Sequence, residues 1–404
     1  MKSCLTILLL FTHLFVYPQQ SGRFMVVGDM HHYSPSPDLT GTILYELGMA
    51  AIEEEVDFIF FVGDLIVSNF SSPEQEEQQL RDWRFLLDTL NYHAIKMYAC
   101  RGNNDVSSID AWNLLFSGEY SFPQNGPEGE KNLTYAIVYD NLLFLSLDMY
   151  TNYHRINQDW LDEILLAQPR VHIFAAGHES AFKVGQPATM NTYPTDRDKF
   201  WESLISAGAK VYFCGHDHFY DHARIDDGDG NPGNDIHQVI VGTGRTSFHS
   251  DGEYNGTNGR WTPIRIHHEE NAGYVLIELS GEEAQLTWKH RIAQHIFGEG
   301  GDSWSFLEPV GVKHNNSGNE FDLKVYPNPC RDETIFSCHV PDACHIQLVV
   351  CDLLGRKITG ITDSYVLPGS YSFGWNTKDL KPGIYLFRLL TNDQIEQSLQ
   401  VVSR

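Results

Sequence analysis

Residues 211–220, VYFCGHDHFY, are the stretch on which the interpretation of the whole chain depends. The apolar run 211–213 is typical of a buried strand, and a glycine separates it from the first histidine. His216 and His218 are two positions apart, so in extended backbone their side chains share a face. A single His-x-His pair is weak evidence for a metal site. The pair gains meaning only if other segments supply further ligands.

Such segments recur along the chain, each directly after an apolar run. The runs 24–27, 58–62, 95–99 and 171–174 all lead into glycine turns with polar residues, and helical patterns alternate with them. This alternation predicts an α/β domain. Because ligands bind at the carboxyl ends of strands in such sheets, we expect the polar residues to meet at one edge. These residues are Asp29, His31, Asp64, Asn103, His178, His216 and His218.

Composition limits the possible functions. The 404 residues are enough for two or three domains, and 42% hydrophobic residues indicate an ordinary globular protein. The formal net charge of −25 repels nucleic-acid backbones and anionic membranes, so strong nucleic-acid binding is not expected. If the substrate is an anion, a local cation must overcome this field. Bound metal ions would provide it.

The first 20 residues have the features of a secretory signal peptide. A lysine at position 2 precedes the apolar run 5–16, and polar residues follow at 19–21. No later segment is apolar enough to span a bilayer, so we expect an exported protein without a transmembrane anchor.

Residues 22–295 resemble the calcineurin-like metallophosphoesterases. The family pattern is Asp-x-His, Gly-Asp, Gly-Asn-His-Asp or Glu, a lone His and Gly-His-x-His, in that order. Here the corresponding segments are Asp29-Met30-His31, Gly63-Asp64, Gly102-Asn103-Asn104-Asp105, His178 and Gly215-His216-Asp217-His218. The resemblance implies a four-layer α/β/β/α sandwich over 21–296. It also implies a metal-dependent phosphoric ester hydrolase that acts through a metal-bridging hydroxide.

The same resemblance implies two metal ions. The first would be held by Asp29, His31, Asp64 and His218. The second would share Asp64 as a bridge and add Asn103, His178 and His216. A nitrogen and oxygen ligand set without thiolate suits Fe, Mn or Zn and does not select among them. Asp217, between the two histidines, is expected to point away and to be structural.

Asn104 is the position at which the chain departs from the family. It stands where the family usually has the histidine that contacts phosphate and protonates the leaving group. The amide of Asn104 carries no positive charge to attract phosphate and no proton that it can give to a leaving group. Loss of a general acid typically costs about 10²–10⁴-fold in rate. A missing cation matters more for a dianionic monoester than for a monoanionic diester. We therefore expect diesterase activity on a small phosphate ester. The candidate catalytic residues are Asn104, Asp105 and Arg245. Of these, Asn104 and Arg245 are expected to contact the substrate.

Two alternatives to a diesterase stay open. Residues 215–220 also resemble the last motif of the purple acid phosphatases, which are phosphomonoesterases. That family, however, has no histidine at the position of His31 and has a tyrosine where Val67 stands. The second alternative is a catalytically weak surface binding protein that has kept its metals.

The segment 226–231 resembles a Ca²⁺ loop, with Asp227 and Asp229 as its candidate ligands. No glutamate stands at the twelfth position counted from Asp227, which favours an ordinary Asp/Gly turn.

The C-terminal part of the chain has a different character. Residues 297–320 are rich in Gly, Asn and Ser and indicate a linker. Residues 321–404 predict a small β-sandwich that resembles the C-terminal sorting domain of the type IX secretion system in Bacteroidetes. This resemblance implies the secretion machinery as a partner, and release or attachment at the cell surface. The sequence does not choose a pairing among Cys330, Cys338, Cys344 and Cys351.

Overall fold

The structure is a computed structural model of the chain. It describes residues 21–31, 42–66, 73–106, 109–139, 141–168, 170–250, 252–254, 260–307, 324–326, 330, 333–340, 343–351, 357–378, 383–391 and 394–403. The expected signal peptide, 1–20, lies outside these residues. Two compact units make up the chain, Met1–Leu307 and Glu308–Arg404. None of the described helices is long and apolar enough to cross a membrane.

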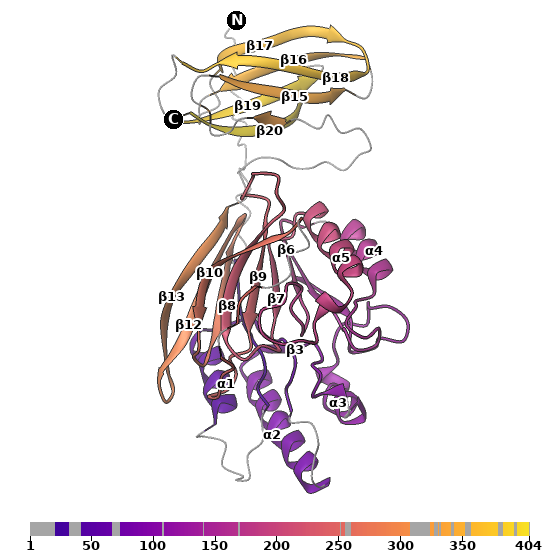
Figure 1. Cartoon of the computed structure of the whole chain (residues 1–404), viewed down its shortest axis with the longest axis vertical. Coiled ribbons are helices and arrows are strands. Elements are labelled where there is room, and N and C mark those ends of the chain that lie inside the picture. The colour runs from indigo at the N-terminus through magenta and orange to yellow at the C-terminus, as the bar shows by residue number, and fades with distance from the viewer. Residues whose placement is uncertain are drawn as a thin grey trace, which may run out of the picture. The chain divides into compact units, whose positions relative to one another are not determined.

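The first unit contains two mixed sheets (Figure 1). The first sheet has the order β13 (Ile296–Leu307), β12 (Glu283–Ala293), β11 (Gly273–Ser280), β1 (Ser21–Val27), β2 (Phe58–Phe61), β3 (Lys96–Ala99). The second has the order β10 (Thr262–Glu269), β8 (Tyr220–Asp226), β9 (Ile236–Val241), β7 (Val211–Cys214), β6 (His172–Ala176), β5 (Leu142–Ser146), β4 (Tyr135–Tyr139).

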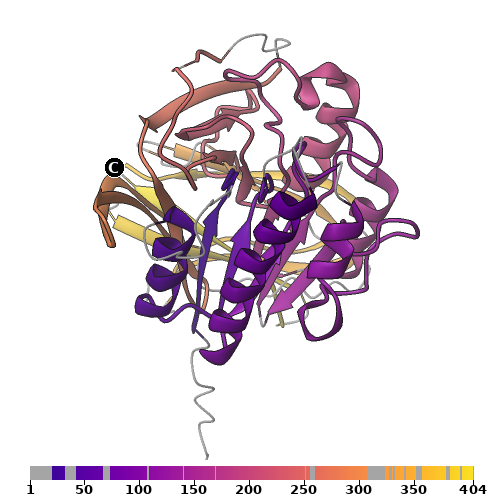
Figure 2. The ribbon, with the colours of Figure 1, turned by 90° about the horizontal axis from the view of Figure 1, so that it is seen from below.

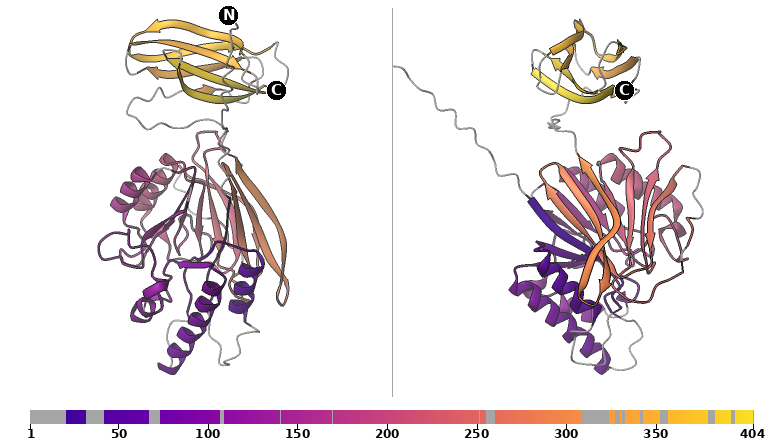
Figure 3. Two further views of the ribbon diagram at one scale, coloured as in Figure 1. Left: turned by 180° about the vertical axis from the view of Figure 1, so that it is seen from behind. Right: turned by 90° about the vertical axis from the view of Figure 1, so that its left-hand side faces the viewer.

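Parallel pairing joins the strands of one edge of the first sheet and those at the centre of the second sheet. β1, β2 and β3 are parallel, and β5, β6, β7 and β9 are parallel. A parallel connection must return to the other end of the sheet. Helices make this return between β1 and β2, β2 and β3, β5 and β6, and β6 and β7, whereas the strand β8 makes it between β7 and β9. The antiparallel partner of β1 is β11, which lies about 250 residues further along the chain (Figure 3). The strand ends that carry the predicted site residues all belong to the parallel strands.

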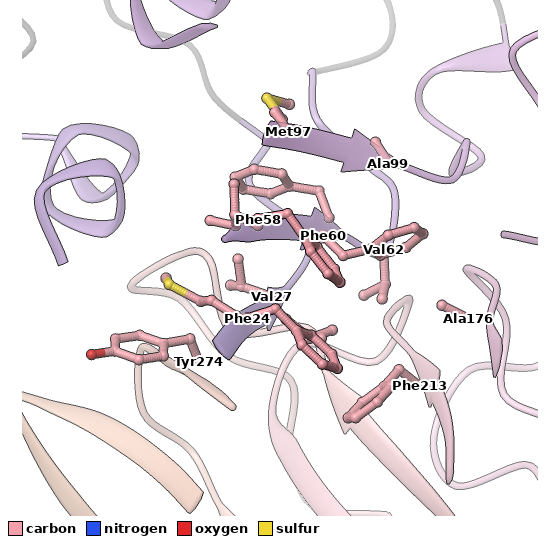
Figure 4. Packing of buried hydrophobic residues seen from close by; sticks show 14 of the residues in the cluster. Phe24, Val27, Phe58, Phe60, Val62, Met97, Ala99, Ala176, Phe213 and Tyr274 are labelled. Atoms are coloured by element: carbon pink, nitrogen blue, oxygen red, sulfur yellow. The ribbon is translucent and has the colours of Figure 1, made fainter. Parts of the chain in front are cut away.

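The two sheets pack face to face through aromatic side chains. Phe144 of β5 lies 4.6 Å from Phe60 and 5.8 Å from Phe24, measured between ring centroids. Phe213 of β7 lies in the same cluster (Figure 4). Its ring centroid is 6.3 Å from that of Phe144. All four of these rings are buried. The interface between the sheets is therefore the main core of this unit.

Helices cover the outer faces of the two sheets. The helices α1 (Ile43–Glu53) and α2 (Pro73–Tyr92) cover the first sheet (Figure 2). Their side chains Leu47 and Trp83 are fully buried. The helices α4 (Gln158–Ala167) and α5 (Pro194–Ser206) cover the second sheet. Two shorter elements, α3 (Ile109–Leu115) and η2 (Gly118–Tyr120), follow β3, and η3 (Met190–Thr192) precedes α5. The predicted four-layer α/β/β/α sandwich is confirmed.

The second unit is the expected all-β sandwich. One sheet has the order β14 (Lys324–Tyr326), β15 (Glu333–Val340), β18 (Gly369–Asn376). The other has the order β17 (Lys357–Val366), β16 (Cys344–Cys351), β19 (Gly383–Thr391), β20 (Gln394–Ser403). All pairings are antiparallel, and Phe336 and Phe387 stack at 3.8 Å in the core. Cys330, Cys338 and Cys344 carry free thiols.

The boundary between the units differs from the prediction. The expected linker, 297–320, begins too early, because residues 296–307 form β13, the outer strand of the first sheet. The glycines that suggested a linker belong to an irregular strand with two register shifts against β12. Trp304 of β13 stacks on the buried His222 of β8 at 4.0 Å, so the strand is part of the packed unit. Residues 308–320 lie outside those described.

Replacing Phe144 with alanine should lower the free energy of unfolding by about 3–5 kcal/mol, because it leaves a cavity between the sheets. Urea denaturation of the full chain, followed by tryptophan fluorescence, measures this change. Phe85→Ala is the matched control, since the Phe85 side chain is 53% exposed; it should change stability by less than about 0.5 kcal/mol. Equal effects of the two substitutions would contradict the proposed core.

Candidate metal centre

The carboxyl ends of the parallel strands in both sheets meet at one place. Asp29 follows β1 and His216 follows β7, and the His216 N–H donates to the Asp29 carboxylate at 3.0 and 3.1 Å. His178 follows β6 and donates through Nδ1 to the carbonyl of Val62, after β2, at 2.8 Å. These contacts span 116 to 187 residues of sequence. The predicted convergence of the loops therefore takes place between the sheets as well as within each sheet.

Two glycines allow the loops to come this close. A Cβ at Gly215 would stand 2.0 Å from Asp29 Oδ2, and one at Gly102 would stand 2.2 Å from Asp64 Oδ1. Any larger residue would displace a carboxylate of the centre. The glycines seen in the sequence before His216 and Asn103 are thus required by packing.

Four of the predicted ligands have left-handed backbone, a conformation unusual for residues other than glycine. The φ angles are 54° at Asp29, 41° at His31, 53° at Asp64 and 67° at His216. Asp and His tolerate this region better than β-branched residues do. Strained backbone of this kind is concentrated at functional sites, where the surrounding structure maintains it.

The first group of candidate ligands is Asp29, His31 and His218. One donor atom from each lies within 4.8 Å of the other two. His218 Nε2 is 3.4 Å from Asp29 Oδ1. His31 Nε2 is 2.8 Å from Asp64 Oδ2, which connects this group to the second one.

The second group of candidate ligands is Asp29, Asp64 and His178. One donor atom from each of these residues lies within 4.8 Å of the other two. His178 Nε2 is 3.5 Å from Asp64 Oδ2 and 3.1 Å from Asn103 Oδ1. Because Nδ1 of His178 donates to a carbonyl, the lone pair needed for a metal is on Nε2. His216 lies beside it, with the ring centroids 5.1 Å apart.

The chemistry of this centre fits two bound cations. His216 Nε2 is buried and has no hydrogen-bond partner among the residues that the structure describes, which is expected of a ligand atom without its metal. Burial and the neighbouring His178 lower the pKa of His216 to about 4, which keeps its lone pair available. For His178, burial lowers the pKa, but Asp64 and Asp29 outweigh it and raise the pKa to about 10. The raised pKa of His178 expresses a concentration of negative charge that a cation would neutralise.

A family comparison identifies this part of the chain. Residues 22–220 match the family model of the calcineurin-like phosphoesterases, and residues 324–403 match that of the secretion system C-terminal sorting domain. Residues 22–220 form a calcineurin-like phosphoesterase domain. The chain is accordingly a metal-dependent phosphoesterase, and its second unit is a type IX sorting domain that points to secretion or the cell surface.

Several solved structures are similar to the chain. The purple acid phosphatase PPD1 of yellow lupin is 15% identical with a TM-score of 0.51, over 72% of this chain and 54% of that one. The GAP50 anchor of the Plasmodium inner membrane complex is 15% identical with a TM-score of 0.45, over 69% and 88%. A dimetal phosphatase of Danio rerio is 10% identical with a TM-score of 0.44, over 71% and 98%. No curated protein matches the chain.

Asn104 and Asp105 of the phosphoesterase domain have separate roles. Asn104 reaches the centre, where its N–H donates to Asp64 Oδ1 at 2.8 Å and its Nδ2 donates to Oδ2 at 2.6 Å. Asp105 lies behind the centre and is 1% exposed. Its oxygens accept the backbone N–H groups of Asp64 (2.9 Å), Gly102 (2.8 Å), Leu65 (3.1 Å) and Ile66 (3.3 Å). A carboxylate held in this way joins two loops, which favours a positioning role for Asp105 over the predicted catalytic role.

Arg245 lies beside the first group of ligands. Its Nη1 is 3.4 Å from His218 Nε2, while Nε and Nη2 donate to Ser247 Oγ at 3.1 and 2.7 Å. Burial lowers the pKa of Arg245, and Asp29 and Asp64 oppose that effect. The guanidinium is thus held next to the site that would take an anionic substrate.

The candidate Ca²⁺ loop has the geometry of successive turns. Asp227 Oδ1 accepts the Asp229 N–H at 2.9 Å, and Asp229 Oδ1 accepts the Asn231 N–H at 2.6 Å. Asp226, Asp227 and Asp235 do cluster, but Arg224 forms an ion pair with Asp235. The turn interpretation of the sequence accounts for these contacts.

Sequence reasoning missed two groups that support the centre. Arg101 forms a buried two-pronged ion pair with Asp148, 2.9 Å through each nitrogen, which joins the loop after β3 to the loop after β5. His249 stacks on His218 with the centroids 3.8 Å apart. The arginine beside Gly102 was a visible signal, whereas no local pattern distinguishes His249.

Asp105→Ala should weaken metal binding about 10–100-fold, because the loops that carry Asp64 and Asn103 lose their shared acceptor. Titration calorimetry with Mn²⁺ measures the affinity. Asp110→Ala, at an exposed carboxylate on α3, is the control and should bind metal as the unmodified protein does. Unchanged affinity in Asp105→Ala would show that Asp105 does not position the ligands.

Proposed function

We propose that the chain is an exported two-metal phosphodiesterase. The observation that carries this proposal is the meeting of two imidazoles on one carboxylate oxygen. His31 Nε2 and His178 Nε2 approach Asp64 Oδ2 at 2.8 and 3.5 Å from opposite groups of ligands. This geometry suits a carboxylate that bridges two cations. Asp29, His31, Asp64 and His218 would hold the first cation, and Asp64, Asn103, His178 and His216 the second.

The metal ions would supply an activated water and offset the charge on the phosphoryl oxygens. The protein's own groups then determine the substrate. Arg245 is the one cation that we assign to the phosphate, since its guanidinium is fixed by Ser247 and lies 3.4 Å from His218 Nε2. Asn104 faces Asp64 with a neutral amide, which can orient a phosphoryl oxygen but cannot protonate a leaving group.

This charge balance favours diesters. A diester carries one negative charge, which Arg245 and the cations can match. A dianionic monoester would gain most from the second positive group that a histidine at position 104 would provide. Arg245 also favours a second candidate, a phosphomonoesterase like the purple acid phosphatases, because it restores one positive charge to the site. A metal-retaining binding protein is a third candidate.

Export would begin with a signal peptide over residues 1–20 and continue through the type IX sorting domain. Outside the cell the substrate would be an extracellular phosphate ester. Fe, Mn or Zn would all suit the ligand set, so the identity of the bound metal must be measured by metal analysis.

The test uses the full chain loaded with Mn²⁺ and assayed on bis(p-nitrophenyl) phosphate and p-nitrophenyl phosphate. We expect two metal ions per chain, faster hydrolysis of the diester, and loss of at least about 100-fold in kcat/KM in His216→Ala. Faster hydrolysis of the monoester would support the phosphatase candidate. Two bound metals without hydrolysis of either ester would support the binding protein.

Asn104→His should restore the charged proton donor that the family usually has. We expect the ratio of monoester to diester kcat/KM to rise by at least about tenfold, because the added imidazolium acts mainly on the dianionic substrate. Asn104→Gln, which stays neutral, is the control and should leave the ratio unchanged. An unchanged ratio in Asn104→His would show that the residue at position 104 does not determine the preference between monoesters and diesters.

A further inference from the structure

The segment that follows β9 returns to the metal centre through His249. The His218 N–H donates to His249 Nδ1 at 3.2 Å, and the His249 N–H donates to the His218 carbonyl at 3.1 Å. The two rings are stacked, with centroids 3.8 Å apart and planes inclined by 24°. His249 thus contacts both the backbone and the ring of a predicted metal ligand, 31 residues away in sequence.

A second segment holds His249 from the other side. Gln186 Nε2 is 3.1 Å from His249 Nδ1, and the Gln186 N–H donates to Asp217 Oδ1 at 2.8 Å. Asp217 is fully buried and lies between His216 and His218 in the sequence. The contacts therefore form a closed path from the ligand loop through Asp217, Gln186 and His249 back to His218.

Two different histidines contact the His218 imidazole, one edge to face and the other by stacking. The edge-to-face contact with His31, at 5.0 Å between centroids, lies on the metal side. The face contact with His249 determines the plane of the ring. His178 is oriented differently, by donation from its Nδ1 to the carbonyl of Val62. Groups that orient a metal-bound histidine change metal affinity when they are removed.

We infer that His249 is a positioning residue that orients His218 toward the first metal ion. This inference rests on the proposed function, in which His218 is a ligand. The same segment carries Arg245, whose guanidinium donates to Ser247 and lies next to His218. His249 acts by orienting His218 and takes no part in the reaction itself.

The test is a titration of the metal-free full chain with Co²⁺, followed by calorimetry and by the visible absorption of the bound ion. In His249→Ala we expect one of the two binding events to weaken about 10–100-fold and its Co²⁺ absorption to shift, because the His218 ring is free to turn. The second event should stay within about twofold. His249→Phe keeps a stacked ring and should recover most of the lost affinity.

Gln186→Ala provides a second route, since it removes the side chain that holds His249 and leaves the main-chain bond to Asp217 in place. It should weaken the same binding event in the same direction, even if His249→Ala does not fold. His93→Ala, at an exposed histidine after α2, is the matched control and should bind both ions normally.

The outcomes separate this inference from the proposed function. If the unmodified protein does not bind two ions, the proposed metal centre is wrong. If it binds two ions, and Gln186→Ala and any folded His249 variant bind both with unchanged affinity and absorption, the positioning role alone is wrong. Equal weakening of both binding events, in parallel with a fall in melting temperature, would also overturn it.

Discussion

The carboxylate of Asp64 is the group on which the arrangement of the phosphoesterase domain depends. It is 1% exposed, and its two oxygens receive Asn104, His31 and His178 from three other loops. A buried carboxylate is costly unless each oxygen is paired. Here burial raises the pKa of Asp64, but His178 and His31 outweigh it and hold the pKa well below its usual range. The charge is therefore kept, and the loops are held around it.

This constraint explains features of the chain that look unrelated. Asp105 accepts the backbone N–H groups around Asp64, so the carboxylate cannot move away from its partners. Gly102 is required because a Cβ there would touch Asp64 Oδ1. The left-handed backbone at Asp64 itself is maintained by these contacts. These contacts thus fix the position of Asp64 within the cluster of candidate ligand atoms.

Segments outside the candidate ligand motifs also contribute polar groups beside the centre. Arg245 and His249 follow β9, and Gln186 follows β6. Of these three side chains, the guanidinium of Arg245 would pair with a phosphate, whereas His249 and Gln186 contact the loop that carries His218. The groups that select a phosphate ester and those that orient a candidate metal ligand would thus come from the same two segments.

The sequence alone predicted the α/β class and seven candidate ligand residues, because a polar residue behind a glycine at the end of an apolar strand is a local pattern. The family resemblance implied the four layers. The sequence also separated the sandwich at 321–404. It did not place the end of the first unit, since β13 is held by cross-strand bonds and by Trp304 on His222. Only the tertiary structure gave Asp105 a positioning role and brought His249 to His218. Both depend on contacts between segments 31 to 41 residues apart, and no local pattern encodes such contacts.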